Sequence, residues 1–270
     1  MIFSRGGWAC AFALMACVSV TSACLPVETP EPKEGELIVF AAVSLSDVLQ
    51  EVGRVYQRQL GVNLVFNFAG SNLLAQQILA SSTADVFLSA DEEWMNVLDR
   101  AGRVQSETRH ALLSNTLVVI APKGSPWEVK AATDLCGLDF RFLSLGNPEY
   151  VPAGRYARKW LQTLSCDGLT LWEVVSGRLS PAPDVRAVLG QVEAVAGVIG
   201  IVYQTDYAVA RDRVKLLHAV PALEGPPIRY WLSQLSEAPH PEAAASFLEF
   251  LYSDISQAIF KKQGFVIMAD

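Results

Sequence analysis

The sequence is poor in the residues and motifs that enzymes and metal centres use. Its three histidines, His110, His218 and His240, stand far apart and have no neighbours at the spacing of zinc ligands. It has no Gly-x-Ser-x-Gly elbow, no Gly-x-x-x-x-Gly-Lys phosphate loop and no Gly-x-Gly-x-x-Gly dinucleotide fingerprint. These absences favour a protein that is not an enzyme and has no cofactor.

Positive charge is also scarce. The chain of 270 residues has 21 Lys and Arg against 28 Asp and Glu, which gives a formal net charge of −7. An acidic chain argues against nucleic acid as a partner. It also disfavours a diffuse basic surface that traps anions, so any bound anion has to be held by local hydrogen bonds.

Long apolar runs are confined to the N-terminus. Residues 1–23 have one charge, at Arg5, followed by an apolar run that begins at Trp8 and ends at Val20. This pattern predicts a signal peptide, because the run is too short to span a membrane comfortably. Residues 24–36 are rich in Pro and Glu, as expected of a flexible tether. We therefore expect a periplasmic or otherwise extracytoplasmic protein.

The end of the signal peptide offers a lipidation site at Cys24. The segment Thr21-Ser22-Ala23-Cys24 resembles a bacterial lipoprotein cleavage site, although Thr21 is an imperfect match. Cleavage there would leave a lipidated cysteine directly before the tether and would anchor the protein to a membrane. Cys17 is a rival site, and a released, soluble protein is the third alternative.

Only two of the five cysteines lie beyond the export region, Cys136 and Cys166. An exported pair predicts one disulfide, because the compartment is oxidising. Cys136 precedes a predicted strand and Cys166 follows the helix after it, so a returning helix would bring both to the same edge. Two buried thiols are the alternative.

Strand and helix signals alternate along the rest of the chain, which predicts an α/β fold. We expect two domains, each with a mostly parallel sheet flanked by helices. Domain I is expected to comprise residues 37–116 and 215–270, and domain II residues 117–214. The chain would then cross between the domains near Leu117 and near Val214.

Groups that donate hydrogen bonds recur at the ends of the predicted strands. Ser44 and Ser71 each follow a strand and precede a helix, and residues 146–156 join a strand to a helix through a glycine-containing loop. Ligands of open α/β sheets bind beyond the carboxyl ends of strands, and unpaired N–H groups at a helix start favour an anion. Each serine alone also fits a plain role as a helix cap. The pattern predicts an oxyanion site if these segments meet.

Six short motifs follow one another along the chain. They are Phe40-Ala41-Ala42-Val43-Ser44-Leu45, Phe68-Ala69-Gly70-Ser71, Ala84-Asp85-Val86-Phe87-Leu88-Ser89-Ala90-Asp91, Asn147-Pro148-Glu149-Tyr150-Val151-Pro152-Ala153-Gly154, Asp184-Val185-Arg186 and Gly200-Ile201-Val202-Tyr203. In this order they resemble the periplasmic molybdate-binding components of ABC transporters, over a range from about Leu37 to Phe265. Val43 and Gly70 depart from the pattern, since relatives often have a small Ala or a Ser there.

The resemblance implies a two-domain solute-binding protein of type II, with its ligand in the cleft between the domains. It implies that molybdate or tungstate is bound by the hydroxyls of Ser44, Ser71 and Tyr203 and by the main-chain N–H groups of Ala153 and Val185. The implied partner is an ABC-transporter permease in the membrane, and we expect a monomer. The resemblance implies no cofactor and no direct metal ligand, because the molybdenum is bound as an oxyanion.

The chemistry of this donor set fits a fully deprotonated dianion. Molybdate and tungstate carry no proton at neutral pH, so the best surroundings consist of donors without a carboxylate. Sulfate has the same charge and a smaller size, so sulfate or another oxyanion is an alternative ligand. An exported enzyme on the same fold is the alternative from a different class. We interpret Arg155 and Arg186 as surface or inter-domain pairing groups.

Overall fold

The computed structural model describes residue 2 and residues 36–81 and 83–268. The predicted signal peptide (1–23, apart from Ile2) and the predicted tether (24–36, apart from Glu36) lie outside the described residues, as do the candidate lipidation sites Cys17 and Cys24. Within the described part, no helix is long and apolar enough to cross a membrane.

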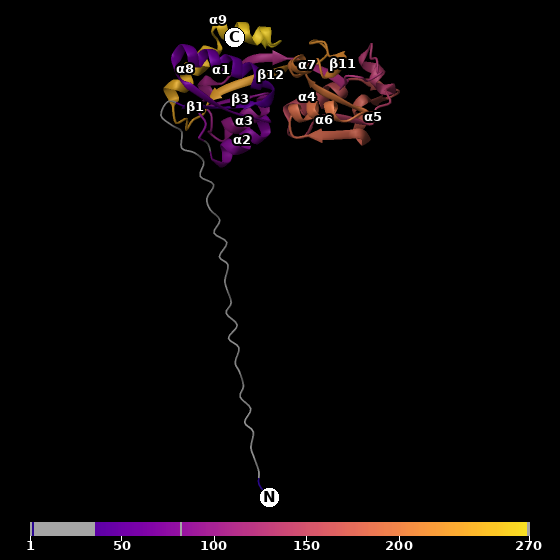
Figure 1. Cartoon of the computed structure of the whole chain (residues 1–270), viewed down its shortest axis with the longest axis horizontal. Coiled ribbons are helices and arrows are strands. Elements are labelled where there is room, and N and C mark those ends of the chain that lie inside the picture. The colour runs from indigo at the N-terminus through magenta and orange to yellow at the C-terminus, as the bar shows by residue number, and fades with distance from the viewer. Residues whose placement is uncertain (1, 3–35, 82, 269–270) are drawn as a thin grey trace. The chain divides into compact units, whose positions relative to one another are not determined.

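The first of two lobes is built on a six-stranded sheet with the order β13-β4-β12-β3-β1-β2. Its strands are β1 (Glu36–Ala42), β2 (Asn63–Ala69), β3 (Val86–Ser89), β4 (His110–Asn115), β12 (Ile228–Gln234) and β13 (Val266–Ile267). Its helices are α1 (Ser46–Leu60), α2 (Ser71–Ala80), α3 (Glu92–Arg100), α8 (Pro241–Leu251) and α9 (Asp254–Lys262), with the 3-10 turns η1 (Val43–Leu45) and η2 (Ser106–Thr108). Figure 1 shows α1 and α8 on one side of this sheet and α2 and α3 on the other.

The second lobe is built on a five-stranded sheet with the order β11-β5-β10-β6-β9. Its strands are β5 (Leu117–Pro122), β6 (Phe142–Gly146), β9 (Leu179–Ala182), β10 (Val198–Tyr203) and β11 (Val214–Ala219), and β7 (Ser165–Cys166) and β8 (Leu169–Thr170) form a separate hairpin. Its helices are α4 (Pro152–Leu161), α5 (Leu171–Val175), α6 (Val185–Ala194) and α7 (Gln204–Ala210), with the 3-10 turns η3 (Ala132–Gly137) and η4 (Ser176–Arg178).

The hydrophobic periodicity of the chain explains how the helices cover the sheets. In β1, Leu37 and Val39 are fully buried on the face that packs against α1, whose Val48 and Val52 lie on one stripe. The opposite face of the same sheet packs against α2 and α3 in a second apolar cluster. Apolar residues alternate along the strands and recur every three to four residues along the helices. This pattern lets helices pack on both faces of the sheet.

The α/β class with two helix-flanked sheets is confirmed, but both sheets are mixed and not mostly parallel. Four of their strand pairings are parallel. Five are antiparallel. Each antiparallel pairing involves at least one of the strands β4, β5, β11, β12 and β13. Two parallel neighbours need a crossover connection, usually a helix, whereas antiparallel neighbours do not.

The return crossing between the lobes was predicted too early. The chain leaves the first sheet after β4 and enters the second with β5, so the first crossing lies at Thr116. On the way back, β11 still pairs with β5, from Val214 to Ala219. The return therefore follows Ala219 and does not occur near Val214. An apolar strand pattern predicts a strand but does not say which sheet the strand joins.

The predicted disulfide between Cys136 and Cys166 is confirmed. The two Cα atoms lie 5.7 Å apart, and the bond joins η3 to β7 across a sequence separation of 30 residues. A cross-link of this kind restricts the unfolded chain and so favours the folded state. It lies in the second lobe, at the end of the helix α4 that contributes to the site described next.

Candidate functional site

A small cavity lies between the two lobes, where strands of both sheets end. Its volume is about 20 Å³. On the same measure one water molecule needs roughly 10–15 Å³, so the cavity suits a compact ion and not a sugar or a nucleotide. It is lined by Ala42, Val43, Ser44, Ala69, Gly70, Ser71, Ala90, Val151, Pro152, Ala153, Asp184, Val185 and Tyr203. The structure thus brings together all five residues predicted to bind an oxyanion.

Four helical segments begin at this cavity. η1 begins at Val43, α2 at Ser71, α4 at Pro152 and α6 at Val185, and each of these residues lines the cavity. The first N–H groups of a helix have no partner within the helix, and the helix dipole adds partial positive charge there. The described residues of the lining include no Lys or Arg. The cavity therefore favours an anion through backbone groups.

The hydroxyl of Ser71 is oriented by the main chain of Ala90. The Ala90 N–H donates to Ser71 Oγ at 2.9 Å, and Ser71 is 1% exposed. Because Oγ accepts this bond, the hydroxyl proton is free to point into the cavity. Ala90 is not among the site residues predicted from the sequence, because a residue that acts through its N–H leaves no side-chain signal.

Tyr203 ends β10 and has a buried hydroxyl. Its side chain is 1% exposed, and within the described part of the chain its Oη makes no hydrogen bond. Asp206 accepts the Tyr203 N–H at 3.3 Å, which fixes the backbone at this point. Burial raises the pKa of Tyr203 above its usual value, so the hydroxyl keeps its proton. A buried donor without an acceptor is costly, and an anion in the cavity would satisfy it.

The N-terminus of α4 lies against the end of β6 because Gly154 has no side chain. A Cβ at Gly154 would stand 1.8 Å from the carbonyl oxygen of Gly146. The helix begins at Pro152, within the predicted strand-to-helix loop of residues 146–156, and proline has no N–H to leave unpaired. The Ala153 N–H is then the first donor of the helix, and none of the described residues accepts it.

Asp184 lines the cavity, but its carboxylate serves α6. Its Oδ1 accepts the N–H groups of Arg186 and Ala187, both at 2.9 Å, so Asp184 is the N-cap of this helix. These bonds leave the Val185 N–H without an acceptor among residues 36–81 and 83–268. None of the five residues predicted to bind the anion has a carboxylate, but the lining as a whole includes that of Asp184. The Oδ1 of this carboxylate points to the N–H groups of the helix.

Arg155 and Arg186 pair with acidic side chains of the first lobe, as interpreted from the sequence. Arg186 Nη2 lies 2.5 Å from Asp47 Oδ2 of the first lobe. Its Nε also lies 2.7 Å from the buried Asp206 Oδ1 of its own lobe. Arg155 Nη1 lies 3.1 Å from Asp91 Oδ2. Neither arginine lines the small cavity. The Arg186–Asp47 and Arg155–Asp91 pairs join the two lobes.

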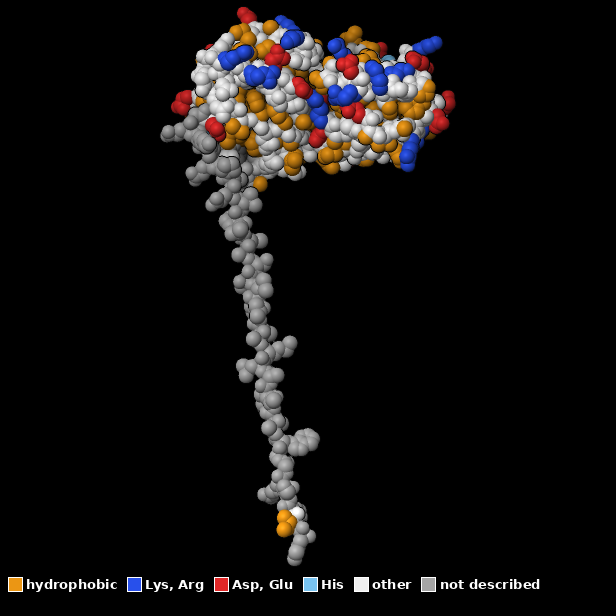
Figure 2. Space-filling model, viewed as in Figure 1, with side chains coloured by type: hydrophobic (Ala, Val, Ile, Leu, Met, Phe, Trp, Pro, Cys, Tyr) orange, Lys and Arg blue, Asp and Glu red, His pale blue; other side chains and the backbone are white. Residues whose placement is uncertain are grey.

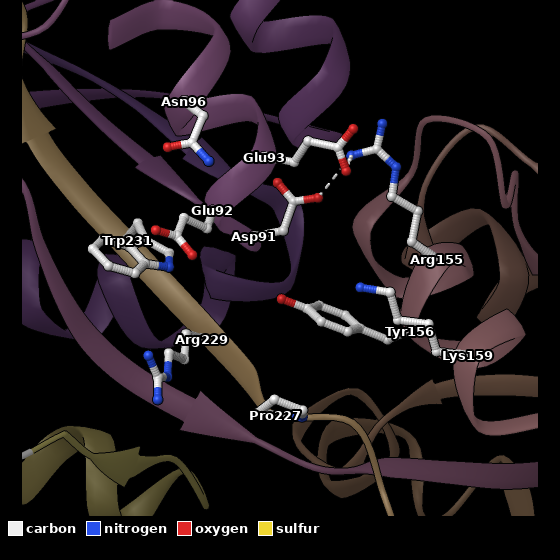
Figure 3. Close-up of a pocket in the computed structure, with 10 residues that line it drawn as sticks. All are labelled: Asp91, Glu92, Glu93, Asn96, Arg155, Tyr156, Lys159, Pro227, Arg229 and Trp231. Atoms are coloured by element: carbon white, nitrogen blue, oxygen red, sulfur yellow. Dashed lines mark hydrogen bonds and ion pairs between the residues drawn. The ribbon is translucent and has the colours of Figure 1, made fainter. Parts of the chain in front are cut away.

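A larger cavity of about 440 Å³ lies beside the Arg155–Asp91 pair (Figure 3). Its charged lining residues are Asp91, Glu92, Glu93, Arg155, Lys159 and Arg229, three acidic and three basic. Figure 3 shows the carboxylates near the start of α3 on one side and the side chains of α4 on the other. These charges balance, so this cavity offers an anion no net attraction. Figure 2 likewise shows both signs interspersed over the visible face.

Metal coordination finds no support in the described part of the chain. No group of three or more His, Cys, Asp or Glu side chains there could hold a metal ion. His240 Nδ1 instead lies 3.3 Å from the buried Asp85, which also accepts the N–H groups of His240 and Ile38. Asp85 is thus a structural acceptor that ties β1 to the segment before α8.

A family model for bacterial extracellular solute-binding proteins matches residues 37–266. The matched range contains both lobes and every residue of the small cavity. The chain belongs to this solute-binding family. The family has a transport role and an extracytoplasmic location.

This solute-binding protein is 37% identical to the molybdate-binding protein ModA of Escherichia coli, over 87% of this chain and 90% of that protein. It is 32% identical to the putative ABC transporter substrate-binding lipoprotein YvgL of Bacillus subtilis, over 88% of each. A solved substrate-binding domain of a putative molybdenum ABC transporter from Clostridium difficile is 31% identical, with a TM-score of 0.67, covering 87% of this chain and 99% of that one. The family resemblance found in the sequence is confirmed.

Proposed function

We propose that this protein is the molybdate-binding component of an ABC transporter. The anion is bound by the hydroxyls of Ser44, Ser71 and Tyr203 and by the N–H groups of Ala153 and Val185. The observation that carries this proposal is the buried Tyr203 hydroxyl, which has no partner among the described residues and lies in a cavity lined by the starts of four helical segments. The similarity to ModA supports molybdate as the ion. Tungstate has the same charge and nearly the same size, so it is expected to bind the same donors.

Neutral donors are sufficient to hold such a dianion. Hydrogen bonds to a charged group contribute roughly 1.5–3 kcal/mol each, and several of them together offset the dehydration of the anion. Ser44 and Ser71 belong to the first lobe, whereas Ala153, Val185 and Tyr203 belong to the second. The bound anion therefore bridges the lobes and favours the closed state.

The closed protein, acting as a monomer, delivers the ion to a membrane permease and carries out no reaction of its own. Lipidation at Cys24 would keep it at the membrane surface, with residues 25–36 as the tether. The similarity to YvgL, which is named a lipoprotein, supports this anchoring. Replacing Cys24 with Ser should abolish incorporation of labelled palmitate in cells, whereas Cys17→Ser should not. Loss of label only in the Cys17 variant would assign the rival site.

Calorimetric titration with molybdate, tungstate, sulfate and phosphate at one pH tests the ligand. We expect tight binding of molybdate and tungstate, and Ser71→Ala should raise the Kd for molybdate about 10- to 100-fold because one charge-assisted bond is lost. Ser81→Ala, at the exposed other end of the same helix, is the matched control. Tight phosphate binding without molybdate binding would overturn the assignment, and preference for sulfate would favour the alternative ligand.

A further inference from the structure

Tyr230 lies behind the small cavity, next to its lining residues Ser44 and Tyr203. It is on β12, is 1% exposed, and is not among the residues that line the cavity. Its Oη lies 3.1 Å from Ser44 Oγ. Its ring packs against Tyr203 and Phe265, with centroids 5.8 Å and 5.6 Å apart. The ring is therefore held in place by two aromatic neighbours, and its hydroxyl is directed at Ser44, one of the residues proposed to bind the anion.

The amide of Asn115 sets the direction of the hydrogen bonds around Tyr230. Asn115 Oδ1 accepts the N–H of Thr116 at 2.9 Å. Its Nδ2 donates to Thr205 Oγ1 at 2.8 Å and to Tyr230 Oη at 3.4 Å. An amide nitrogen has two protons, so these two bonds use both. Tyr230 Oη is consequently an acceptor from Asn115.

The proton of Tyr230 is then available for Ser44. A tyrosine hydroxyl has one proton, and Ser44 Oγ is the remaining hydroxyl within hydrogen-bond distance. If Ser44 Oγ accepts from Tyr230, its own proton is directed to the cavity. Burial raises the pKa of Tyr230, so its hydroxyl does not lose the proton that this chain of bonds requires. Bonds aligned in this way also polarise one another.

We propose that Tyr230, oriented by Asn115, is a positioning residue that keeps the Ser44 hydroxyl a donor to the anion and thereby selects for oxyanions without a proton. This role rests on the proposed function. Phosphate near neutral pH carries a proton and needs an acceptor for it, which a fixed donor cannot supply. The one carboxylate of the lining, Asp184, has its Oδ1 turned to the N–H groups of α6. Without the Tyr230 hydroxyl, Ser44 Oγ becomes free to accept.

Tyr230→Phe tests this role because it removes the hydroxyl and keeps the ring. We expect the Kd for molybdate to rise about three- to tenfold. The preference for molybdate over phosphate, measured as the ratio of the two Kd values in calorimetry, should fall by about tenfold or more. Tyr56→Phe is the matched control, since Tyr56 is fully buried in the same lobe and its Oη donates to Ser246 Oγ at 3.2 Å. It should leave both quantities unchanged.

Asn115→Leu provides an independent variant, because it removes the donor that orients Tyr230 and leaves the tyrosine in place. The selectivity ratio should shift in the same direction as in Tyr230→Phe. A loss of packing alone would weaken molybdate and phosphate together and leave their ratio constant, which would overturn the role. Unaltered Kd values in both variants, with tight molybdate binding by the parent, would also overturn it while the proposed function stands. A parent that binds no molybdate would overturn the proposed function itself.

Discussion

Individual polar groups decide what the small cavity can bind. Ser71 accepts from Ala90 and so offers its own proton, and Tyr203 offers a proton that no described residue accepts. No described residue accepts the Val185 N–H, because the Asp184 carboxylate bonds instead to the N–H groups of Arg186 and Ala187. Each donor is thus prepared by a neighbour before any ligand arrives, which reduces the cost of ordering it on binding.

Tyr203→Phe should separate binding from stability. The Kd for molybdate is expected to rise about 10- to 100-fold, because one charge-assisted hydrogen bond is lost. The ligand-free protein should be unchanged or more stable in thermal unfolding, since the variant removes a buried donor that no described residue accepts. A purely structural tyrosine would show the reverse, with lower stability and unchanged binding.

Asp206 should make stability depend on pH. Burial raises the pKa of its carboxyl to about 6, although Arg186 acts to lower it. A carboxyl whose pKa is higher in the folded state binds a proton on folding, so its contribution to the free energy of unfolding falls as pH rises from about 4 to about 6 and is constant above.

Asp206→Asn should remove this dependence. In urea unfolding, the free energy of unfolding of the variant minus that of the parent should increase by about 1–3 kcal/mol as the pH is raised from about 4 to about 7. Other acidic groups titrate equally in both proteins, so the difference isolates Asp206. Parallel curves for the two proteins would contradict the raised pKa.

Helix starts supply the remaining donors, and their placement depends on close contacts between elements. The start of α4 reaches the cavity because Gly154 lets the helix lie against Gly146 at the end of β6. Gly146 is confined in turn, since a Cβ there would stand 2.5 Å from Val151 Cγ1. The position of the Ala153 N–H therefore depends on two glycines that make no contact with a ligand themselves.

Gly154→Ala should displace this helix start. The new Cβ would overlap the Gly146 carbonyl, so we expect a loss of about 2 kcal/mol or more in the free energy of unfolding and at least tenfold weaker molybdate binding. Gly190→Ala in α6 is the control, because a Cβ there meets no atom within 4 Å. It should stabilise the protein by about 0.5–1 kcal/mol. Unchanged binding in Gly154→Ala would show that the α4 start does not position a donor.

Several side chains join the two lobes. Arg186 reaches Asp47 on α1, and Trp94 Nε1 on α3 donates to the Tyr150 carbonyl at 2.8 Å. The chain crosses between the lobes only twice in the described part, at Thr116 and after Ala219. Two crossings permit a hinge motion, and the inter-lobe contacts favour its closed end.

Asp47→Asn should weaken the closed state without touching the cavity. Molybdate is expected to dissociate about two- to fivefold faster, in line with the loss of one partly exposed ion pair worth roughly 0.5–1 kcal/mol. Glu51→Gln on the same helix is the control, because Glu51 pairs with Lys262 of the same lobe at 3.0 Å. Equal dissociation rates for the two variants in stopped-flow measurements would contradict a role of Asp47 in closure.

Ligand-driven closure should also be visible in solution scattering. We expect the radius of gyration to decrease when saturating molybdate is added, because the anion bridges donors of both lobes. Sulfate at the same concentration is the comparison. Identical profiles with and without molybdate would count against a hinge motion.

The sequence by itself determined the α/β class, most of the strands and helices, the disulfide and the five residues that meet at the cavity. The fold class and the disulfide follow from local signals, whereas the five cavity residues follow from the family resemblance that the six motifs carry. The direction of the strands and the sheet to which each belongs could not be predicted from the sequence. The apolar pattern of β11, for example, would be the same in either sheet.

Only the tertiary structure decided how the donors are oriented. Tyr230 is a strand residue in a buried pattern, and nothing in the sequence links it to Ser44, which is 186 positions away. Ala90 acts through its N–H, and Gly154 through the absence of a side chain. Hydrogen-bond direction and close approach depend on which atoms meet in space, whereas periodicity and spacing report only on neighbours along the chain.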